Sequence, residues 1–186
     1  MLQGMRDRDP VQWDRFVLLF GPLVYEWCRR RRIPEHDAAD IVQEVFRAVA
    51  SRISSFRKER AEDTFQGWLR RITHHKVADY FRQLAKHPAA PGGSTANVQM
   101  SNIAFDVPET WDEDEAGLDQ QALYRRAMEL LESSFERRTW QAFWKIAVEE
   151  QPARTVAEEL EMTPGAVHNA RYKVLRKLRE EFDELL

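Results

Sequence analysis

The chain has 186 residues, 43% of them hydrophobic, and a net charge of −3 at pH 7, which suits one domain or two small ones with hydrophobic cores. No apolar run approaches the ~20 residues that cross a bilayer, and the N-terminus lacks the apolar core of a signal peptide. The single cysteine, Cys28, excludes an intrachain disulfide and a cysteine-cluster zinc site. We therefore expect a cytoplasmic protein that does not insert into membranes.

Charge is unevenly distributed along the chain. Residues 1–86 hold 17 Lys and Arg against 12 Asp and Glu, residues 87–121 hold 7 acidic residues and no basic one, and residues 122–186 hold 11 basic against 12 acidic. Binding to nucleic acid depends on the local field and not on the total charge. Two helical ends separated by an acidic segment are therefore compatible with nucleic-acid binding.

The first long helix is predicted to begin at Asp9-Pro10, because Asp is a favoured N-cap and Pro a favoured first helical residue. An apolar stripe follows for roughly four turns, at helical spacing. It comprises Trp13, Phe16, Val17, Phe20, Leu23, Val24 and Trp27. We interpret this helix as scaffold.

Residues 37–86 read as two amphipathic helices joined by a charged loop over residues 57–63. In the first helix Ile41, Val42, Val45, Phe46 and Val49 mark an apolar face. The opposite face carries Asp37, Asp40, Gln43, Glu44 and Arg47. Thr64 is placed to cap the second helix.

The apolar face of that second helix is expected to change direction. Phe65, Trp68, Leu69 and Ile72 define one stripe, and after His75 and Lys76 the apolar residues resume as Val77, Tyr80, Phe81 and Leu84. An aromatic face flanked by basic residues could stack unpaired bases. The alternative is that Tyr80 and Phe81 simply fill the core between helices.

Residues 88–117 are expected to form a flexible acidic linker, because they combine Pro88, Pro91 and two glycines with an acidic run at residues 112–115. Ile103, Phe105 and Trp111 could anchor it, or could have no structural role.

From Leu118 onward the pattern is helical again and ends in a helix-turn-helix. Ser133 and Thr155 each precede a glutamate at capping-box spacing, and Thr163-Pro164 is predicted to begin the last helix. Val156, Leu160, Met162, Val167 and Ala170 occupy the apolar positions of the motif. Glu161 stands at the turn position that often holds glycine, so a left-handed conformation there would be strained.

The outer face of the last helix suits a DNA major groove. It presents Thr163, Gly165, His168, Asn169, Arg171, Tyr172, Lys173, Arg176 and Lys177. Arg and Lys can contact guanine or phosphate, and Asn can pair with adenine. Residues near the start of such a helix enter the groove, whereas later ones lie nearer the phosphates.

The chain resembles the extracytoplasmic-function (group IV) sigma factors of bacterial RNA polymerase in two places. The resemblance to their region 2 lies in residues 37–46, Phe56-Arg57, Phe65 to Leu69, Ile72, Asp79-Tyr80 and Arg82. The helix-turn-helix resembles their region 4. The resemblance implies a two-domain all-α protein: region 2 at 8–87, the linker at 88–117 and region 4 at 118–186. It implies no enzymatic activity and no cofactor. His75 departs from the Asn that is usual in the family.

The resemblance also assigns roles to residues. Core polymerase would dock on Asp37, Asp40, Gln43, Glu44 and Phe46. The melted minus-10 element would meet Arg57, Lys76, Tyr80 and Arg82, with the loop 54–63 as pocket wall. The outer face of the last helix would read the minus-35 duplex, and region 4 would also meet the polymerase flap. An inhibitory anti-sigma factor is a further partner that the family permits and the sequence does not identify.

Two other functions compete with this interpretation. A stand-alone transcriptional regulator with an N-terminal sensor or dimerisation domain would account for the helix-turn-helix but not for the acidic-glutamine helix. A metalloenzyme could use His74, His75, Asp79 and His87, although two ligands on one helix face are too few for a closed site.

Overall fold

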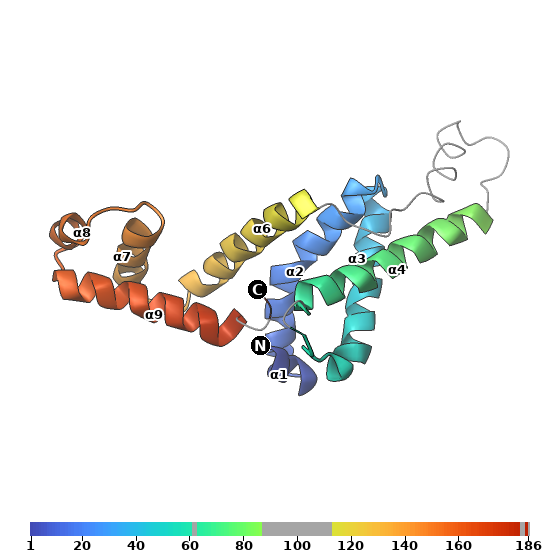
Figure 1. The fold of residues 1–186 in the computed structure, drawn as a ribbon, viewed down its shortest axis with the longest axis horizontal. Coiled ribbons are helices and arrows are strands. Elements are labelled where there is room, and N and C mark those ends of the chain that lie inside the picture. Colours follow the sequence, from blue (N-terminus) through green and yellow to red (C-terminus); the bar gives the residue numbers. More distant parts are fainter. Residues whose placement is uncertain (61–62, 87–112, 183–184, 186) are drawn as a thin grey trace.

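The computed structural model describes residues 1–60, 63–86, 113–182 and 185, and within these ranges it is helical with no strand (Figure 1). This confirms the predicted all-α class. The helices are α1 (Leu2–Arg6), α2 (Pro10–Arg30), α3 (Glu35–Arg52), a 3₁₀ turn η1 (Ile53–Ser55), α4 (Phe65–Lys86), α6 (Glu113–Glu132), α7 (Arg137–Ala147), α8 (Ala153–Glu159) and α9 (Pro164–Phe182). No described helix is long and apolar enough to cross a membrane.

Helix α2 begins where the sequence predicts. The Asp9 carboxylate accepts a hydrogen bond from the backbone N–H of Val11 at 2.9 Å, and Pro10 is the first helical residue. The preceding helix α1 has no counterpart in the prediction. Its Met5 is buried, and the indole of Trp13 donates to the Met5 carbonyl at 3.2 Å. We refer to α1–α4 as the first bundle.

An aromatic network forms the core of the first bundle. The Phe65 ring at the start of α4 lies 5.8 Å from Phe16, and 5.4 Å from each of Phe20, Phe56 and Trp68, between ring centroids. Most of these pairs meet edge to face, the arrangement that aromatic quadrupoles favour. The network fixes α2 and α4 around one centre.

The apolar face of α4 continues through Thr73 into the same core cluster, so the expectation that its second half faces something else was wrong. Thr73 is fully buried between Leu69 and Val77, and its hydroxyl donates to the Leu69 carbonyl at 2.9 Å. A threonine with its hydroxyl bonded within the helix can occupy a core position. Phe81 is also buried, which supports the core interpretation of that residue.

Helix α6 begins at Glu113, within the predicted linker of residues 88–117 and not at Leu118. Residues 87–112, with the proposed anchors Ile103, Phe105 and Trp111, lie outside the described structure. The helix runs beside α2 (Figure 1). Its Leu123, Ala127 and Leu131 are buried in the same apolar cluster as the core of α2.

A buried carboxylate joins α6 to the first bundle. Asp119 is 1% exposed and accepts hydrogen bonds from the Trp27 indole at 2.7 Å and from the Arg30 guanidinium at 3.1 Å. Arg70 of α4 bonds to the same carboxylate and lies over the Trp27 ring. A buried charge needs partners of this kind. We call this arrangement the Asp119 clamp.

Helices α6–α9 form the second bundle, which ends in the predicted helix-turn-helix. Val156, Val167 and Ala170 are buried together, and Leu160 and Met162 pack against them. The predicted caps at Ser133 and Thr155 were wrong: α7 and α8 follow Glu136 and Pro152, neither with a side-chain cap. The cap of α9 is confirmed, because Thr163 Oγ1 accepts from the Ala166 N–H at 3.2 Å.

Candidate nucleic-acid and polymerase interface

The outer face of α9 is exposed as its spacing predicts. His168, Asn169, Arg171, Tyr172 and Lys173 are all exposed, as are Thr163 and Gly165. Val167, Ala170 and Val174 of the same helix are buried. A side chain added at Gly165 would meet nothing within 4 Å, so the first turn also faces open space. The N-terminal half of α9 is therefore available to a DNA groove.

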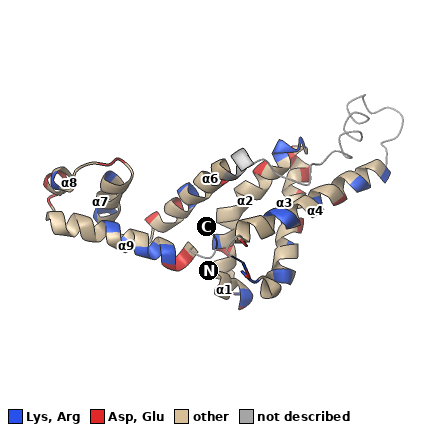
Figure 2. Cartoon of the chain, in the orientation of Figure 1, with Lys and Arg blue, Asp and Glu red and all other residues tan. Residues whose placement is uncertain are grey.

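The C-terminal half of α9 carries a basic row that continues beyond the predicted residues. His168, Arg171, Tyr172, Arg176 and Arg179 line one shallow hollow with Leu175. Arg179 was missed, although its spacing from Arg176 puts it on the same face. Blue basic residues recur along this part of α9 in Figure 2.

Two of the predicted phosphate ligands of α9 form ion pairs within the helix. Arg176 lies 3.4 Å from Glu180, and Lys177 lies 2.8 Å from Glu181. The pair of Arg176 is exposed and therefore weak, because water screens it, so Arg176 can exchange a carboxylate for a phosphate at little cost. Glu181 is only 15% exposed and also pairs with Arg15, so Lys177 is held more firmly.

In the first bundle, residues predicted for two partners line one groove. It has a volume of about 460 Å³ and is lined by Asp37, Asp40, Ile41, Glu44, Lys76, Asp79, Tyr80 and Gln83. The Tyr80 hydroxyl donates to Asp37 at 2.8 Å, and the Lys76 ammonium donates to Glu44 at 3.1 Å. The proposed docking face on α3 therefore contacts the proposed minus-10 residues on α4.

These contacts shift the pKa values of Glu44 and Tyr80. The hydrogen bond from Lys76, followed by the charges of Arg47 and Lys76, lowers the pKa of Glu44 below 4.5. Burial, followed by the hydrogen bond to Asp37, raises the pKa of Tyr80. At neutral pH the groove therefore holds an ionised carboxylate and a neutral phenol that can donate hydrogen bonds.

The remaining predicted residues of the first bundle differ in exposure. Gln43 is exposed, whereas Phe46 packs against the core with its ring 5.1 Å from that of Phe16. Arg57 is exposed, and its guanidinium bonds to the Ser54 and Phe56 carbonyls. Arg82 pairs with Asp79 on the surface of α4.

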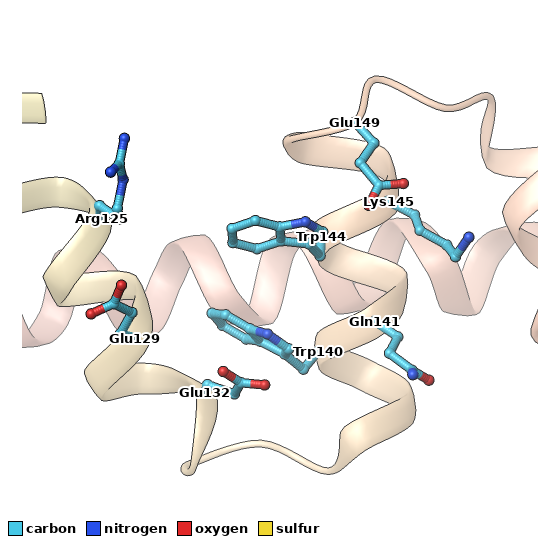
Figure 3. A pocket seen from close by; sticks show the side chains of 8 residues that line it. All are labelled: Arg125, Glu129, Glu132, Trp140, Gln141, Trp144, Lys145 and Glu149. Carbon is cyan, nitrogen blue, oxygen red and sulfur yellow. The ribbon is translucent and has the colours of Figure 1, made fainter.

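A cavity of about 590 Å³ opens between α6 and α7 (Figure 3). Trp140 and Trp144 project from α7 with ring centroids 6.1 Å apart, and Arg125, Glu129 and Glu132 form the wall on α6. Lys145 lines it too. A hydrogen bond to Glu159 raises the pKa of Lys145. An exposed Trp144 beside a mainly apolar cavity is typical of a protein-binding site. Trp140 is buried in the core and only Trp144 of the two is exposed.

The structure offers no support for the metalloenzyme alternative. Among the described residues, no three His, Cys, Asp or Glu side chains come together as a metal site would require. His75 is exposed, and His87 lies outside the described residues.

Comparison with known proteins gives two kinds of match. The family model described as sigma-70 region 2 matches residues 16–87. The ECF RNA polymerase sigma factor ShbA of Streptomyces griseus is 32% identical over 170 residues, which cover 85% of this chain and 81% of that protein. The ECF RNA polymerase sigma factor SigE of Mycolicibacterium smegmatis is 34% identical over 71 residues, covering 38% of this chain and 26% of SigE.

Proposed function

The chain belongs to the extracytoplasmic-function (ECF) sigma factors, which direct transcription initiation by RNA polymerase, and we propose how its surfaces divide that work. As a sigma factor it is a specificity subunit and not an enzyme. This relationship removes the stand-alone regulator from consideration. Its partners are core RNA polymerase and promoter DNA.

The N-terminal half of α9 reads the minus-35 duplex. The observation that carries this assignment is the division of α9 into an exposed polar face and a buried apolar one. His168, Asn169 and Arg171 reach base edges, and Lys173, Arg176, Lys177 and Arg179 serve phosphates. Thr163, Gly165 and Tyr172 complete the surface that faces the DNA.

The groove between α3 and α4 serves core polymerase and the melted minus-10 strand side by side. Asp37, Asp40, Gln43 and Glu44 form a polar face on a helix whose other side is already buried in the core. Phe46 supports that face from the core side. Arg57, Lys76, Tyr80 and Arg82 contact the single strand, because they combine cations with an aromatic ring.

The cavity between α6 and α7 is a second contact with polymerase, at its flap. Two tryptophans supply apolar area, and three glutamates, at positions 129, 132 and 149, would favour a basic rim on the partner. A division into two domains, the first including α1 and the second beginning with α6, belongs to the same proposal. So do a cytoplasmic location and control by an anti-sigma factor.

Binding to core polymerase tests the docking face. The double variant Asp40→Arg with Glu44→Arg should abolish holoenzyme formation by the full chain, since it reverses the charge of the face. Asp7→Arg with Asp14→Arg is a matched control, because both residues are exposed and lie on other elements. Circular dichroism should show equal helix content in both. Unchanged polymerase affinity in the first variant would contradict the assignment.

A further inference from the structure

The turn between α8 and α9 is closed by a backbone arrangement that normally uses glycine. The Met162 N–H bonds to the Ala157 carbonyl at 2.8 Å and the Glu161 N–H to the Glu158 carbonyl at 3.4 Å, which together make a Schellman motif. Glu161 occupies its left-handed position with φ of 50°. A residue with a Cβ is disfavoured there, and an interaction that holds the turn offsets this cost.

That interaction comes from Arg138 in the first turn of α7. Its Nε donates to the Leu160 carbonyl at 2.7 Å, and its Nη2 bonds to the carbonyls of both Leu160 and Glu161. These carbonyls lie at and just beyond the end of α8, where helix geometry leaves acceptors without partners. A guanidinium is well suited to bridge them, because its donors lie in one fixed plane.

Packing holds this turn only in part, because Leu160 and Met162 are partly buried against the core of the helix-turn-helix. Its buried residues are Ala142, Val156, Ala157, Val167 and Ala170, which are small. The ion pair between Lys145 and Glu159, at 2.6 Å, ties α7 to the last residue of α8. Arg138 is the tie that reaches the turn itself, and α9 begins immediately after it.

We propose that Arg138 is a positioning residue for minus-35 recognition. It holds the Leu160–Thr163 turn, and through the turn it sets the direction in which α9 enters the major groove. Arg138 acts on the protein backbone and not on the DNA. The proposal rests on the proposed function of α9 and adds a residue outside the reading face.

The test uses holoenzyme reconstituted from the full chain and two DNA probes. Wild-type holoenzyme first selects the probe sequences from a random library. The first probe is a duplex with only the minus-35 element, and the second is a fork with only the minus-10 element. Arg138→Ala should weaken binding to the first probe by about five- to tenfold and leave binding to the second unchanged. The salt dependence of binding should stay the same, because no phosphate contact is lost.

Two further variants separate positioning from other roles. Glu161→Gly in the Arg138→Ala background should restore most of the affinity, since glycine adopts the left-handed conformation without support. Arg137→Ala removes the same charge from a neighbouring exposed residue and should change affinity by less than about twofold. Arg138→Lys, which keeps the charge but not the planar pair of donors, should show an intermediate loss that Glu161→Gly also rescues.

Three results would overturn the proposal. A salt dependence reduced by about one charge in Arg138→Ala would make the residue a phosphate contact. A loss that Glu161→Gly does not rescue in either Arg138 variant would mean that the turn is not the point of action. Unchanged affinity would mean that Arg138 does nothing for recognition. Arg171→Ala serves as reference: if it too leaves minus-35 binding unchanged, the proposed function of α9 fails, and not the role of Arg138 alone.

Discussion

The cores of the first bundle and of the helix-turn-helix are filled by side chains of different size. The core of the first bundle contains Phe16, Phe20, Trp27 and Phe65, all buried to within 1% exposure. The helix-turn-helix has a separate cluster of alanines and valines. Large rings supply much apolar area per residue, whereas small residues allow helices to cross closely.

This difference predicts where each region is sensitive. The aromatic core fixes α2 and α4 by itself, so the groove of α3 and α4 can carry charged residues for other purposes. The helix-turn-helix depends on polar ties and on the smallness of its core residues. Changes in ring size should therefore damage the first region, and changes in small residues or ties the second.

The largest expected effect is at the centre of the aromatic core. Phe65→Ala should lower the free energy of unfolding by about 3 to 5 kcal/mol, since it leaves a cavity among four aromatic rings. Denaturant unfolding of the full chain measures this. Phe65→Leu, which keeps most of the volume, should cost less than half as much. Equal losses in the two variants would show that the ring network is not what matters.

The Asp119 clamp should give the next largest effect, because it joins the two bundles. Asp119→Asn leaves two arginines facing a neutral group and should cost about 2 to 3 kcal/mol, the partial exposure of Arg30 reducing the penalty. Hydrogen exchange should speed up in α6 before the core of α2. Gln121→Lys, the same charge change at an exposed position of α6, should have little effect. Similar exchange in both variants would argue against the clamp.

Enlarging a small core residue should damage the helix-turn-helix. Ala157→Leu places a larger side chain at a position only 4% exposed and should cost about 1 to 3 kcal/mol, with loss of minus-35 binding. Thr155→Leu adds an equally large side chain at an exposed position of α8 and is the control. Duplex binding and thermal unfolding are to be measured for both variants. If Ala157→Leu binds as wild type, the small core is not a constraint.

The smallest effect concerns the groove of the first bundle. Because the folded-state pKa of Glu44 is lowered by Lys76, this pair stabilises the fold above the ordinary pKa of 4.5, and the contribution is lost as pH falls through the lowered value. NMR titration of the carboxyl should show the pKa rising towards 4.5 in Lys76→Gln. Both side chains are partly exposed, so the change in stability should be slight. An unchanged pKa of Glu44 in Lys76→Gln would show that Lys76 does not lower it.

Sequence reasoning predicted the elements whose signals are local. The cap at Asp9, the cap at Thr163 and the two faces of α9 all follow from residues within a few positions of one another. Periodicity on a helix is set by its own sequence, so these predictions need no knowledge of what packs against it.

The features that were missed depend on contacts between distant residues. Asp119 lies 92 positions from Trp27, and Arg138 lies 22 positions from Leu160, and no pattern in the chain marks either pair. The change of face in α4 was predicted from His75 and Lys76, whereas the core there is filled by Thr73, whose hydroxyl bonds within the helix. The failed capping boxes had the correct spacing but lay where the helices do not begin.

The central claim is that the N-terminal half of α9 reads the promoter sequence, while later residues of the helix contact the phosphate backbone of the DNA. Run-off transcription by reconstituted holoenzyme on a promoter library tests it directly. Arg171→Ala should relax preference at one base pair at a cost of roughly 1 to 3 kcal/mol, whereas Lys177→Ala should weaken all promoters alike and reduce the salt dependence by about one charge. A uniform loss across the library in Arg171→Ala would make that residue a phosphate contact and would contradict the account.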